Sequence, residues 1–553
     1  FLAPVVLKEL HTVDLRPARL ALLWGVSLIG FVVWTGRRPR GVAWLLAAGA
    51  LAAVFGAGFG WSAAALGDSQ RRLLALDRDT LLAGKVSRRL GRLGDGDGDG
   101  VPRLFAGGDC DDTDPSIRPG VYDAPGDGVD QNCTGADLVL AEDPIGGVQR
   151  DPPGERQRWN VVLVTLDAVR YDLSLQHMPE LRKLAAESVE FTNAYAHSAA
   201  TYWSIPALLA SKMPSRLHMG RDQTPVAGEV LLTEVLRQAG FHTGLFANVT
   251  IFFVRGLRQG AMVANYDTSH FTVHGAKPGS AHLTDGLLKH VDAFQAGQLK
   301  GGESMFLWGH YYDPHDPYFE VPEEPAADSS DKARYEALLR YTDRHVGRLV
   351  QGLKDRGLWS KTVFVVTADH GDEFLDHGHR VHGSTRYEEM TQVPLIVHVP
   401  GVGHRTIEGP IGHLEVAPTI LDLLGIAIPR TFTGRSRADE VRTGEAAPLE
   451  PVFLEVFPDS NYAGHQVGVR LGDLKLIYRI SENYFELYDL AADPLERDNV
   501  YDVHPEAPRL RELLLRYADH HLYHLARGLT GAKLPEGAPE KPAPRKRKRG
   551  KRK

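Results

Sequence analysis

Apolar runs and amphipathic segments alternate along the chain from residue 160 onward. The amphipathic segments place leucine and alanine at helical spacings among charged residues, as in 178–188, 231–240 and 334–357. The apolar runs are short and rich in β-branched residues, which is typical of buried strands. They are residues 160–167, 241–249, 304–310, 361–370 and 393–401. This alternation predicts an α/β fold with a largely parallel sheet flanked by helices.

The pattern changes again towards the end of the chain. Residues 467–500, "VGVRLGDLKLIYRISENYFELYDLAADPLERDNV", favour a small antiparallel sheet that packs against the main sheet. We therefore expect a main domain over 159–525 whose C-terminal subdomain covers about 450–525. A linker, 139–158, precedes it.

Two long uncharged runs precede this domain, at about 20–36 and 41–67. Each is about long enough to cross a bilayer of roughly 30 Å, so residues 1–70 are expected to form transmembrane helices. Buried helices of a soluble domain are the alternative. Residues 71–94 are basic and form a juxtamembrane segment that either lies on the membrane surface or is a solvated linker. The distribution of positive charge does not decide the orientation.

The 553-residue chain has a formal net charge of −7, but its basic and acidic residues are concentrated in different segments. Basic residues gather in 71–92 and in the C-terminal tail, so the folded middle is acidic. The tail, 526–553, is predicted to be disordered and could contact anionic lipids or other polyanions. Specific nucleic-acid binding is not expected.

An acidic module is expected over 95–138. Asp95, Asp97 and Asp99 alternate with glycine, which permits a tight backbone with several carboxylates around one point. Oxygen ligands of this kind suit calcium, and three further carboxylates are candidates to complete the shell: Asp109, Asp111 and Asp112. An acidic flexible linker is the alternative. The module resembles short metal-binding repeats of bacterial secreted and surface proteins.

The two cysteines of the chain, Cys110 and Cys133, both fall within this module. A local disulfide explains them better than a redox or zinc site, and a disulfide indicates an oxidising compartment. With the apolar N-terminal runs, this predicts a multi-pass protein of the cell membrane whose main domain lies outside the cytoplasm.

Two predicted strands end in residues that can bind a metal. Asp167 ends the run 160–167, and Asp369 with His370 ends the run 361–370. Ligands of parallel sheets bind beyond the carboxyl ends of the strands. Carboxylates and an imidazole gathered there suit a divalent metal that acts on a phosphoryl or sulfuryl group. A helix-capping aspartate is the alternative for each residue taken alone.

Several motifs resemble those of the sulfatase family of the alkaline phosphatase superfamily, over about residues 158–520. They include "NVVLVTLDAVRYD", "HYYDPHDPY", "VVTADHGDEFLDHGHRVHGSTRYEE" and "HLEVAPTILDLLGI". The resemblance implies an active-site divalent metal (Zn, Mn or Ca) held by Asp167, the nucleophile, Asp369 and His370. It also implies catalytic or substrate-contacting roles for His382 and His315. Further candidate substrate-binding residues are His310, Lys212 and Ser204.

The loop "TYWSIPALLAS", residues 201–211, resembles the nucleophile loop of the family. Sulfatases usually carry there a cysteine or serine that is oxidised to formylglycine, followed by an arginine. Here Thr201 stands at the nucleophile position and Ile205 at that of the arginine, as in phosphoethanolamine and phosphoglycerol transferases. Threonine cannot become an aldehyde by that route, because its Cβ carries a methyl group. Ser204 is the rival nucleophile, although a serine just before a proline-containing first turn is expected to cap a helix.

These observations favour a membrane-anchored, metal-dependent enzyme that transfers phosphoryl groups or hydrolyses phosphodiesters through Thr201. Classical sulfate-ester hydrolysis is the first alternative. A catalytically silent surface or binding protein is the second. The expected substrate is a phosphate or sulfate ester, which could be a lipid or an envelope glycan, and membrane lipids are expected partners.

Overall fold

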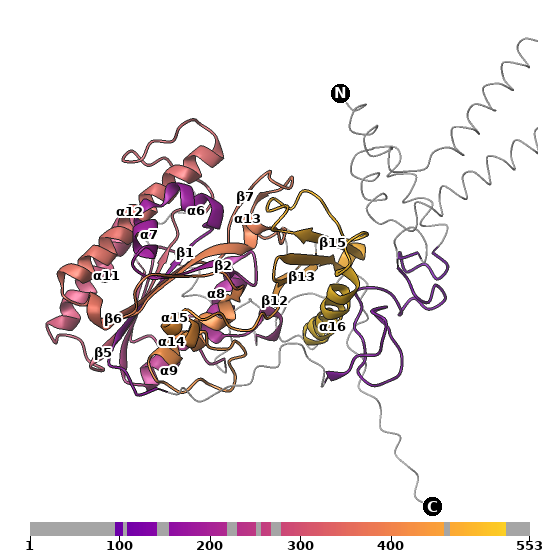
Figure 1. Ribbon diagram of the computed structural model, residues 1–553, viewed down its shortest axis with the longest axis horizontal. Helices are drawn as coiled ribbons and strands as arrows, with labels where there is room; N and C mark the ends of the chain where they lie inside the picture. The colour runs from indigo at the N-terminus through magenta and orange to yellow at the C-terminus, as the bar shows by residue number, and fades with distance from the viewer. Residues whose placement is uncertain are drawn as a thin grey trace, which may run out of the picture. The chain divides into compact units, whose positions relative to one another are not determined.

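The computed structural model describes seven stretches of the chain (Figure 1): 95–102, 108–140, 154–217, 229–249, 256–266, 278–457 and 465–526. These residues form two compact units that divide between Arg118 and Pro119, within the predicted acidic module. The predicted transmembrane segments, the basic segment 71–94 and the tail from residue 527 lie outside the described residues. Among the helices that are described, none combines the length and apolar character needed to span a bilayer.

A nine-stranded mixed sheet forms the centre of the larger unit, in the order β10-β2-β9-β6-β1-β5-β3-β4, with β11 paired to β2. Its strands are β1 (Asn160–Leu166), β2 (Val189–Tyr195), β3 (Phe241–Ala247), β4 (Val263–Tyr266), β5 (Ser304–Tyr311), β6 (Thr362–Ala368), β9 (Gln392–His398), β10 (Arg405–Ile407) and β11 (Ile411–Gly412). All five predicted apolar runs are strands of this sheet, which confirms the α/β expectation.

One strand of the sheet, β9, runs antiparallel to its neighbours, so the sheet is not purely parallel. β1 pairs in parallel with β5 and β6, whereas β9 is antiparallel to both β6 and β2. β2, "VEFTNAY", was not predicted, because its polar residues interrupt the apolar pattern. The central strands β1, β5 and β6 are buried along their whole length, as expected when helices cover both faces of a sheet.

Helices cover both faces of the sheet (Figure 1). One face carries α6 (Tyr171–His177), α7 (Pro179–Ala185), α11 (Ser280–Gln295) and α12 (Asp331–Asp355). The other carries α8 (Thr201–Ala210), α9 (Leu232–Gln238), α14 (Val416–Leu423) and α15 (Ala438–Thr443). A short helix, α13 (Glu388–Thr391), leads into β9, and a two-stranded ribbon, β7 (Glu373–Phe374) with β8 (Arg380–Val381), follows β6.

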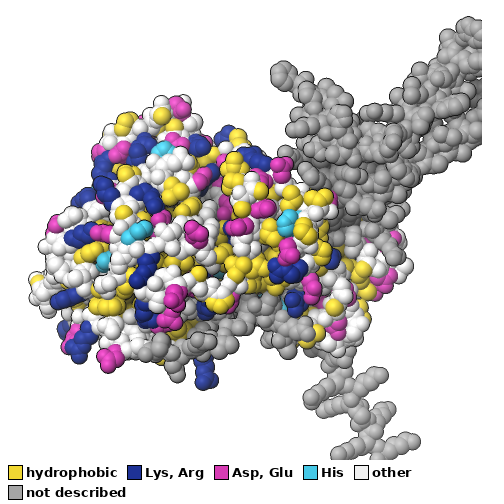
Figure 2. All heavy atoms as spheres, viewed as in Figure 1, with side chains coloured by type: hydrophobic (Ala, Val, Ile, Leu, Met, Phe, Trp, Pro, Cys, Tyr) yellow, Lys and Arg dark blue, Asp and Glu magenta, His cyan; other side chains and the backbone are white. Residues whose placement is uncertain are grey.

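The predicted C-terminal sheet is present. It is antiparallel, in the order β12-β13-β14-β15, with the strands β12 (Val452–Val456), β13 (Gln466–Leu471), β14 (Leu474–Arg479) and β15 (Tyr484–Asp489). The long helix α16 (Ala507–Ala526) packs its Leu510, Leu514 and Tyr517 into one apolar cluster with this sheet. Figure 2 shows acidic and basic side chains intermixed over the visible face of the molecule, so no single sign of charge dominates that face.

Candidate active site at the carboxyl ends of the central strands

The register of neighbouring strands brings two buried aspartates together. Leu166, the last residue of β1, pairs with Ala368 at the end of β6 and with Tyr311 at the end of β5. Asp167 and Asp369 therefore follow at the same edge of the sheet. The amide of Asp369 donates to the carbonyl of Leu166 at 3.0 Å, and both aspartates are fully buried.

The turn after Asp167 is held in an uncommon conformation. Ala168 has a φ of 58°, in the left-handed region that residues with a Cβ rarely adopt. The hydroxyl of Tyr335, on α12, donates to the carbonyl of Ala168 at 2.8 Å and accepts from the amide of Arg170 at 3.1 Å. These contacts fix the turn and hence the direction of the Asp167 side chain.

Each aspartate leaves one carboxylate oxygen without a hydrogen-bond partner. Oδ2 of Asp167 lies 3.0 Å from Nε2 of His310, while its Oδ1 is buried and unpaired. Oδ1 of Asp369 accepts from the amides of Ala168 and His370, at 3.0 and 2.9 Å, while its Oδ2 is buried and unpaired. Buried unpaired carboxylate oxygens are costly unless a cation satisfies them.

His370 completes this group through Nε2. Its Nδ1 lies 2.9 Å from the carbonyl of Gly371, which can only accept, so Nδ1 carries the proton and Nε2 carries the lone pair. Burial, and then the neighbouring His382, lowers the pKa of His370 well below its usual value, so the ring is neutral. Ligand atoms of Asp167, Asp369 and His370 all lie within 4.8 Å of one another.

The hydroxyl of Thr201 lies beside the same group of candidate metal ligands. Thr201 is the first residue of α8, and its hydroxyl oxygen lies 3.0 Å from Nε2 of His370. The positive end of the helix dipole favours negative charge on this oxygen. Only 7% of Thr201 is exposed, so the residue is largely shielded from solvent.

The electrostatics of the group favour a bound cation. Burial raises the pKa of Asp167 well above its usual value, and repulsion from Asp369 adds to this shift. Burial also raises the pKa of Asp369, although His310 opposes the shift. Two unpaired carboxylate oxygens, a neutral imidazole and a hydroxyl form a mixed oxygen and nitrogen donor set that fits a divalent metal such as zinc or manganese.

Two further histidines lie beside this group. The ring of His382, just after β8, packs against the ring of His370 with centroids 4.5 Å apart and against that of His315 with centroids 4.7 Å apart. Partial burial would lower the pKa of His382, but its Nδ1 lies 3.2 Å from Oδ1 of Asp372 and that carboxylate raises the pKa to about 9. His315 stacks on Tyr312.

His310, proposed to bind substrate, instead supports Asp167. Its ring lies on β5 between the hydroxyl of Thr165, 2.8 Å from Nδ1, and the carboxylate of Asp167. Burial lowers the pKa of His310 to about 4, so the ring is neutral. With Thr165 donating to Nδ1, the proton of His310 lies on Nε2 and is donated to Asp167. The histidine therefore orients the carboxylate of Asp167.

Two other expected site residues lie elsewhere. Ser204 is inside α8 rather than capping it, and its fully buried hydroxyl donates to the carbonyl of Asp369 at 2.6 Å. It thus holds the helix to the residue that follows β6. Lys212 follows the opposite end of α8, about 15 Å along the helix from Thr201, and pairs with Glu229 at 2.6 Å.

Sequence reasoning missed Asp372 and Tyr318. Oδ2 of the fully buried Asp372 accepts from the hydroxyl of Tyr318 at 2.5 Å, while Oδ1 lies against His382. The only available signal was the position of Asp372, two residues after His370 in "DHGDE". The pairing with Tyr318 joins positions 54 residues apart and leaves no local pattern.

The acidic module forms a second candidate metal site, within the smaller unit. Carboxylate oxygens of Asp95, Asp97 and Asp99 lie within 4.8 Å of one another. One buried oxygen of Asp97, Asp99 and Asp109 has no hydrogen-bond partner. Burial, followed by repulsion from Asp99, raises the pKa of Asp109.

The remaining carboxylates of the module stabilise its backbone. Oδ1 of Asp112 accepts from the amide of Gly96 at 3.0 Å, and Oδ1 of Asp111 accepts from the hydroxyl of Thr113 at 2.6 Å. Both Cys110 and Cys133 are disulfide-bonded, which agrees with the disulfide expected from the sequence.

Family models match most of the chain beyond residue 108. The model described as Sulfatase matches residues 159–426, and that described as N-sulphoglucosamine sulphohydrolase, C-terminal, matches residues 379–519. A model of a metal-binding motif of the MopE type matches residues 109–137.

Individual relatives agree with these models. The choline-sulfatase of Rhizobium meliloti (strain 1021) is 24% identical over 450 residues, which cover 66% of this chain and 86% of that enzyme. Two further curated sulfatases are matched over only 36% and 34% of their own length.

Solved structures show the same fold. The structure of BT4656 in complex with its substrate D-glucosamine-2-N,6-O-disulfate matches with a TM-score of 0.56 and 16% identity, over 68% of this chain and 99% of that chain. The phosphonate monoester hydrolase SpPMH from Silicibacter pomeroyi matches with a TM-score of 0.53 and 20% identity, over 66% of this chain and 96% of that chain.

Proposed function

Because the chain belongs to the sulfatase family and is a hydrolase of sulfate or phosphate esters, we propose that Thr201 is the nucleophile of this hydrolysis. The observation that carries the proposal is the 3.0 Å contact between the Thr201 hydroxyl and Nε2 of His370, beside two unpaired carboxylate oxygens. A hydroxyl so placed can be ionised and can attack.

The lack of a cysteine at this position supports the same assignment. Both cysteines of the chain lie in the acidic module and are disulfide-bonded. Thr201 cannot be converted to formylglycine, and Ser204 is buried in α8 with its hydroxyl donated to a backbone carbonyl. The hydroxyl of Thr201 itself is therefore the group available for attack.

Asp167, Asp369, His370 and Thr201 would hold the metal. A divalent cation, when bound there, supplies the positive charge that favours ionised Thr201 and polarises the ester. His310 orients Asp167 through its Nε2–H, and the first turn of α8 adds the favourable helix dipole at Thr201. His382 and His315 lie beside the group and are the side chains placed to act on the ester's leaving oxygen.

The proposed reaction has two steps. Thr201 Oγ1 forms a bond to phosphorus or sulfur and the bond to the ester oxygen breaks, so that the alcohol leaves with one proton and the oxyanion group remains on Thr201. Water then attacks the same atom, which releases sulfate, phosphate, a phosphate monoester or a phosphonate according to the ester used and returns the hydroxyl of Thr201. Each step exchanges one oxygen ligand for another.

The comparisons favour the first alternative, sulfate-ester hydrolysis, over the phosphoryl transfer or phosphodiester hydrolysis that the sequence favoured. The relatives found are sulfatases and phosphonate monoester hydrolases, and the choline and glucosamine substrates named for two of them are small polar alcohols or sugars. We propose a sulfate, phosphate or phosphonate ester of a polar alcohol or sugar as the substrate. The threonine nucleophile favours phosphorus over sulfur within that class.

Two features outside the active site complete the proposal. Asp97, Asp99 and Asp109 would hold calcium together with the adjacent Asp95, since each of the first three has a buried oxygen without a hydrogen-bond partner and an all-oxygen ligand set is what this ion prefers. The membrane anchor and the location outside the cytoplasm stay predictions, because the apolar N-terminal segments lie outside the described residues.

A direct test is to trap the covalent intermediate. Purified protein loaded with zinc or manganese is mixed with an aryl sulfate, an aryl phosphate diester or an aryl phosphonate monoester and quenched in acid. The peptide spanning residues 196–216 should gain one oxyanion group, located at Thr201 by fragmentation. Turnover without any such adduct, with an aldehyde found at Ser204, would reject Thr201 as the nucleophile.

A further inference from the structure

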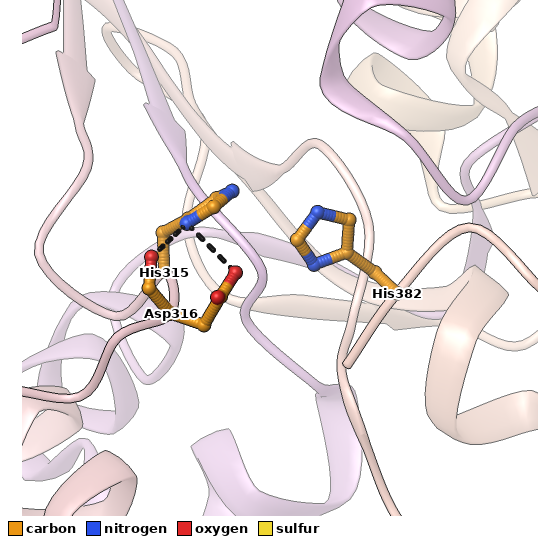
Figure 3. Close-up of side chains that lie close together, drawn as sticks. All are labelled: His315, Asp316 and His382. Carbon is orange, nitrogen blue, oxygen red and sulfur yellow. Dashed lines mark hydrogen bonds and ion pairs between the residues drawn. The ribbon is translucent and has the colours of Figure 1, made fainter. Parts of the chain in front are cut away.

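Arg386 is a buried arginine outside the active site. It lies four residues beyond His382, whose imidazole faces His315 and Asp316 (Figure 3). Arg386 is fully buried, and among the described residues its Nε, Nη1 and Nη2 atoms have no hydrogen-bond partner. A buried charge is costly unless an opposite charge and hydrogen bonds compensate it. We propose that Arg386 binds a small monovalent anion, of the size of chloride, in a buried site beside β12.

The carboxylate that acts on Arg386 is already fully used. Burial lowers the pKa of Arg386 and the charge of Glu455, on β12, opposes this shift, but a guanidinium stays protonated in proteins. Oε2 of Glu455 accepts from the amide of Ser215 at 2.8 Å. Its Oε1 accepts from the hydroxyl of Ser215 at 2.5 Å, from Nδ1 of His521 at 2.7 Å and from the hydroxyl of Tyr517. Glu455 therefore offers Arg386 no further hydrogen bond.

Glu455 is ionised and shares its charge with His521, on α16. Burial alone would raise the pKa of Glu455, but the charge of His521 and the hydrogen bonds that the carboxylate accepts lower it to about 2. The ion pair that Glu455 forms is thus the one with His521, at 2.7 Å. The positive charge of Arg386 is left without a partner of its own.

His465, just before β13, supplies a second unpaired atom. Its Nε2 lies 2.7 Å from Nε2 of His521, and its Nδ1 is buried without a hydrogen-bond partner. The charge of Arg386 acts on His465, so the two belong to one cluster. When His521 donates the proton of the Nε2 contact, His465 carries its own proton on Nδ1. That N–H can then donate to the same anion as Arg386.

Formal charge favours a single negative ion. With Glu455 ionised and His521 protonated on both nitrogens, the charge of Arg386 remains as one uncompensated positive charge. A monovalent anion balances this charge and accepts from the guanidinium. A water molecule can satisfy the hydrogen bonds but not the charge. The anion has to be small, because Arg386 has no exposed surface that a larger group could contact.

His197 is a neutral neighbour of this cluster. Its Nδ1 donates to the carbonyl of Phe453 at 2.6 Å, and burial lowers its pKa to about 4. Its unpaired Nε2 is directed at Gly412, where a Cβ atom would lie only 2.4 Å away. The charge of Arg386 acts on His197, which precedes Thr201 by four residues. The anion would therefore lie beside the segment that leads to α8.

The dependence of stability on chloride tests the site. The full chain is exchanged into gluconate buffer, and Tm is measured as chloride replaces gluconate at constant ionic strength. The Tm of the wild type should rise by about 3 °C or more at saturating chloride, because the ion binds only the folded state. Arg386→Met should lose this rise. Arg356→Met is the matched control, since Arg356 pairs on the surface with Asp292, and it should keep the rise.

Bromide locates the ion. Crystals of the wild type grown in bromide should show an anomalous difference peak within hydrogen-bonding distance of the Arg386 guanidinium, and crystals of Arg386→Met should lack it. Water without anomalous signal beside Arg386 in the wild type would overturn the proposal, even if the variant fails to fold. An equal rise of Tm in the wild type and Arg386→Met would also overturn it. Neither result bears on whether Thr201 is the nucleophile, so the proposed function is judged separately.

Discussion

The hydroxyl oxygen of Thr201 lies 3.0 Å from Nε2 of His370. This contact joins the first residue of α8 to the carboxyl end of β6, two segments that are 169 residues apart in the chain. It places a hydroxyl at the N-terminus of a helix beside carboxylate oxygens that have no hydrogen-bond partner. The proposed chemistry depends on this arrangement.

Replacing Thr201 by alanine should reduce turnover by at least about a thousandfold, because the attacking oxygen is lost. Thr201→Ser keeps the hydroxyl and should retain a measurable fraction. The matched control is Ser204→Ala, which removes a buried hydrogen bond worth about 1 kcal/mol but leaves the attacking group in place. The measurement is kcat/KM on an aryl ester, with thermal unfolding to compare stability. Equal losses in the Thr201→Ala and Ser204→Ala variants would contradict the assignment.

Removing His310 should weaken metal binding rather than remove the nucleophile. His310→Ala leaves Oδ2 of Asp167 without its donor, and loss of such a supporting contact typically costs about 10–100-fold in metal affinity. Chelator competition would measure the affinity. Excess metal should restore much of the activity, and His310→Gln, which keeps an N–H donor, should lose less. Activity that stays low at saturating metal would assign His310 a different role.

The acidic module should bind calcium. Asp97→Asn and Asp99→Asn each remove a carboxylate with a buried oxygen that has no hydrogen-bond partner, although that of Asp99 lies 3.3 Å from Nε of Arg118. Each should lower the calcium affinity by about tenfold or more. Asp114→Asn is the control, because the exposed Asp114 only accepts from Ser116. Isothermal titration calorimetry gives the affinity. Identical calcium binding by all three variants would place the ion elsewhere.

Stability should depend on pH through Asp519 of α16. Burial raises the pKa of Asp519 to about 7, against the hydrogen bonds that it accepts from Asn132 and Thr134. The unfolded carboxyl titrates near 3.8. Between about pH 4 and pH 7, the folded state therefore keeps a proton on Asp519 that the unfolded state has lost. The free energy of unfolding should fall as the pH rises from about 4 to about 7.

The expected change is about 4 kcal/mol, measured by urea unfolding in a chelating buffer at a series of pH values. Asp519→Asn should flatten the profile over that window, since an amide does not titrate. An unchanged slope in the variant would show that another group is responsible.

The sequence was sufficient to place the metal-binding residues at one edge of the sheet. Asp167 and Asp369 follow apolar runs that could only be buried strands, and the carboxyl ends of neighbouring parallel strands meet. The direction of β9 could not be predicted in the same way. A fully buried strand is apolar on both faces whichever way it runs, so its pattern carries no information about direction.

The start of α8 was placed too late for a different reason. A proline usually stands in the first turn of a helix, where its missing N–H is not needed. In α8, Pro206 is the sixth residue, and the helix nevertheless begins at Thr201. Nine of its ten residues are buried, so packing against the sheet and α14 outweighs the local cost of the proline. Tertiary contacts, which a local pattern does not contain, therefore decide where Thr201 lies relative to the helix.

The absence of a cysteine in the loop 196–216 has a consequence for how the enzyme becomes active. An enzyme that works through Thr201 receives its nucleophile at translation and needs no oxidising enzyme to mature it. The fraction of active enzyme would then depend only on folding and on the metal available. Protein made in a host without the formylglycine pathway would then be as competent as protein made in its native cell, and removal and return of metal would switch it off and on reversibly.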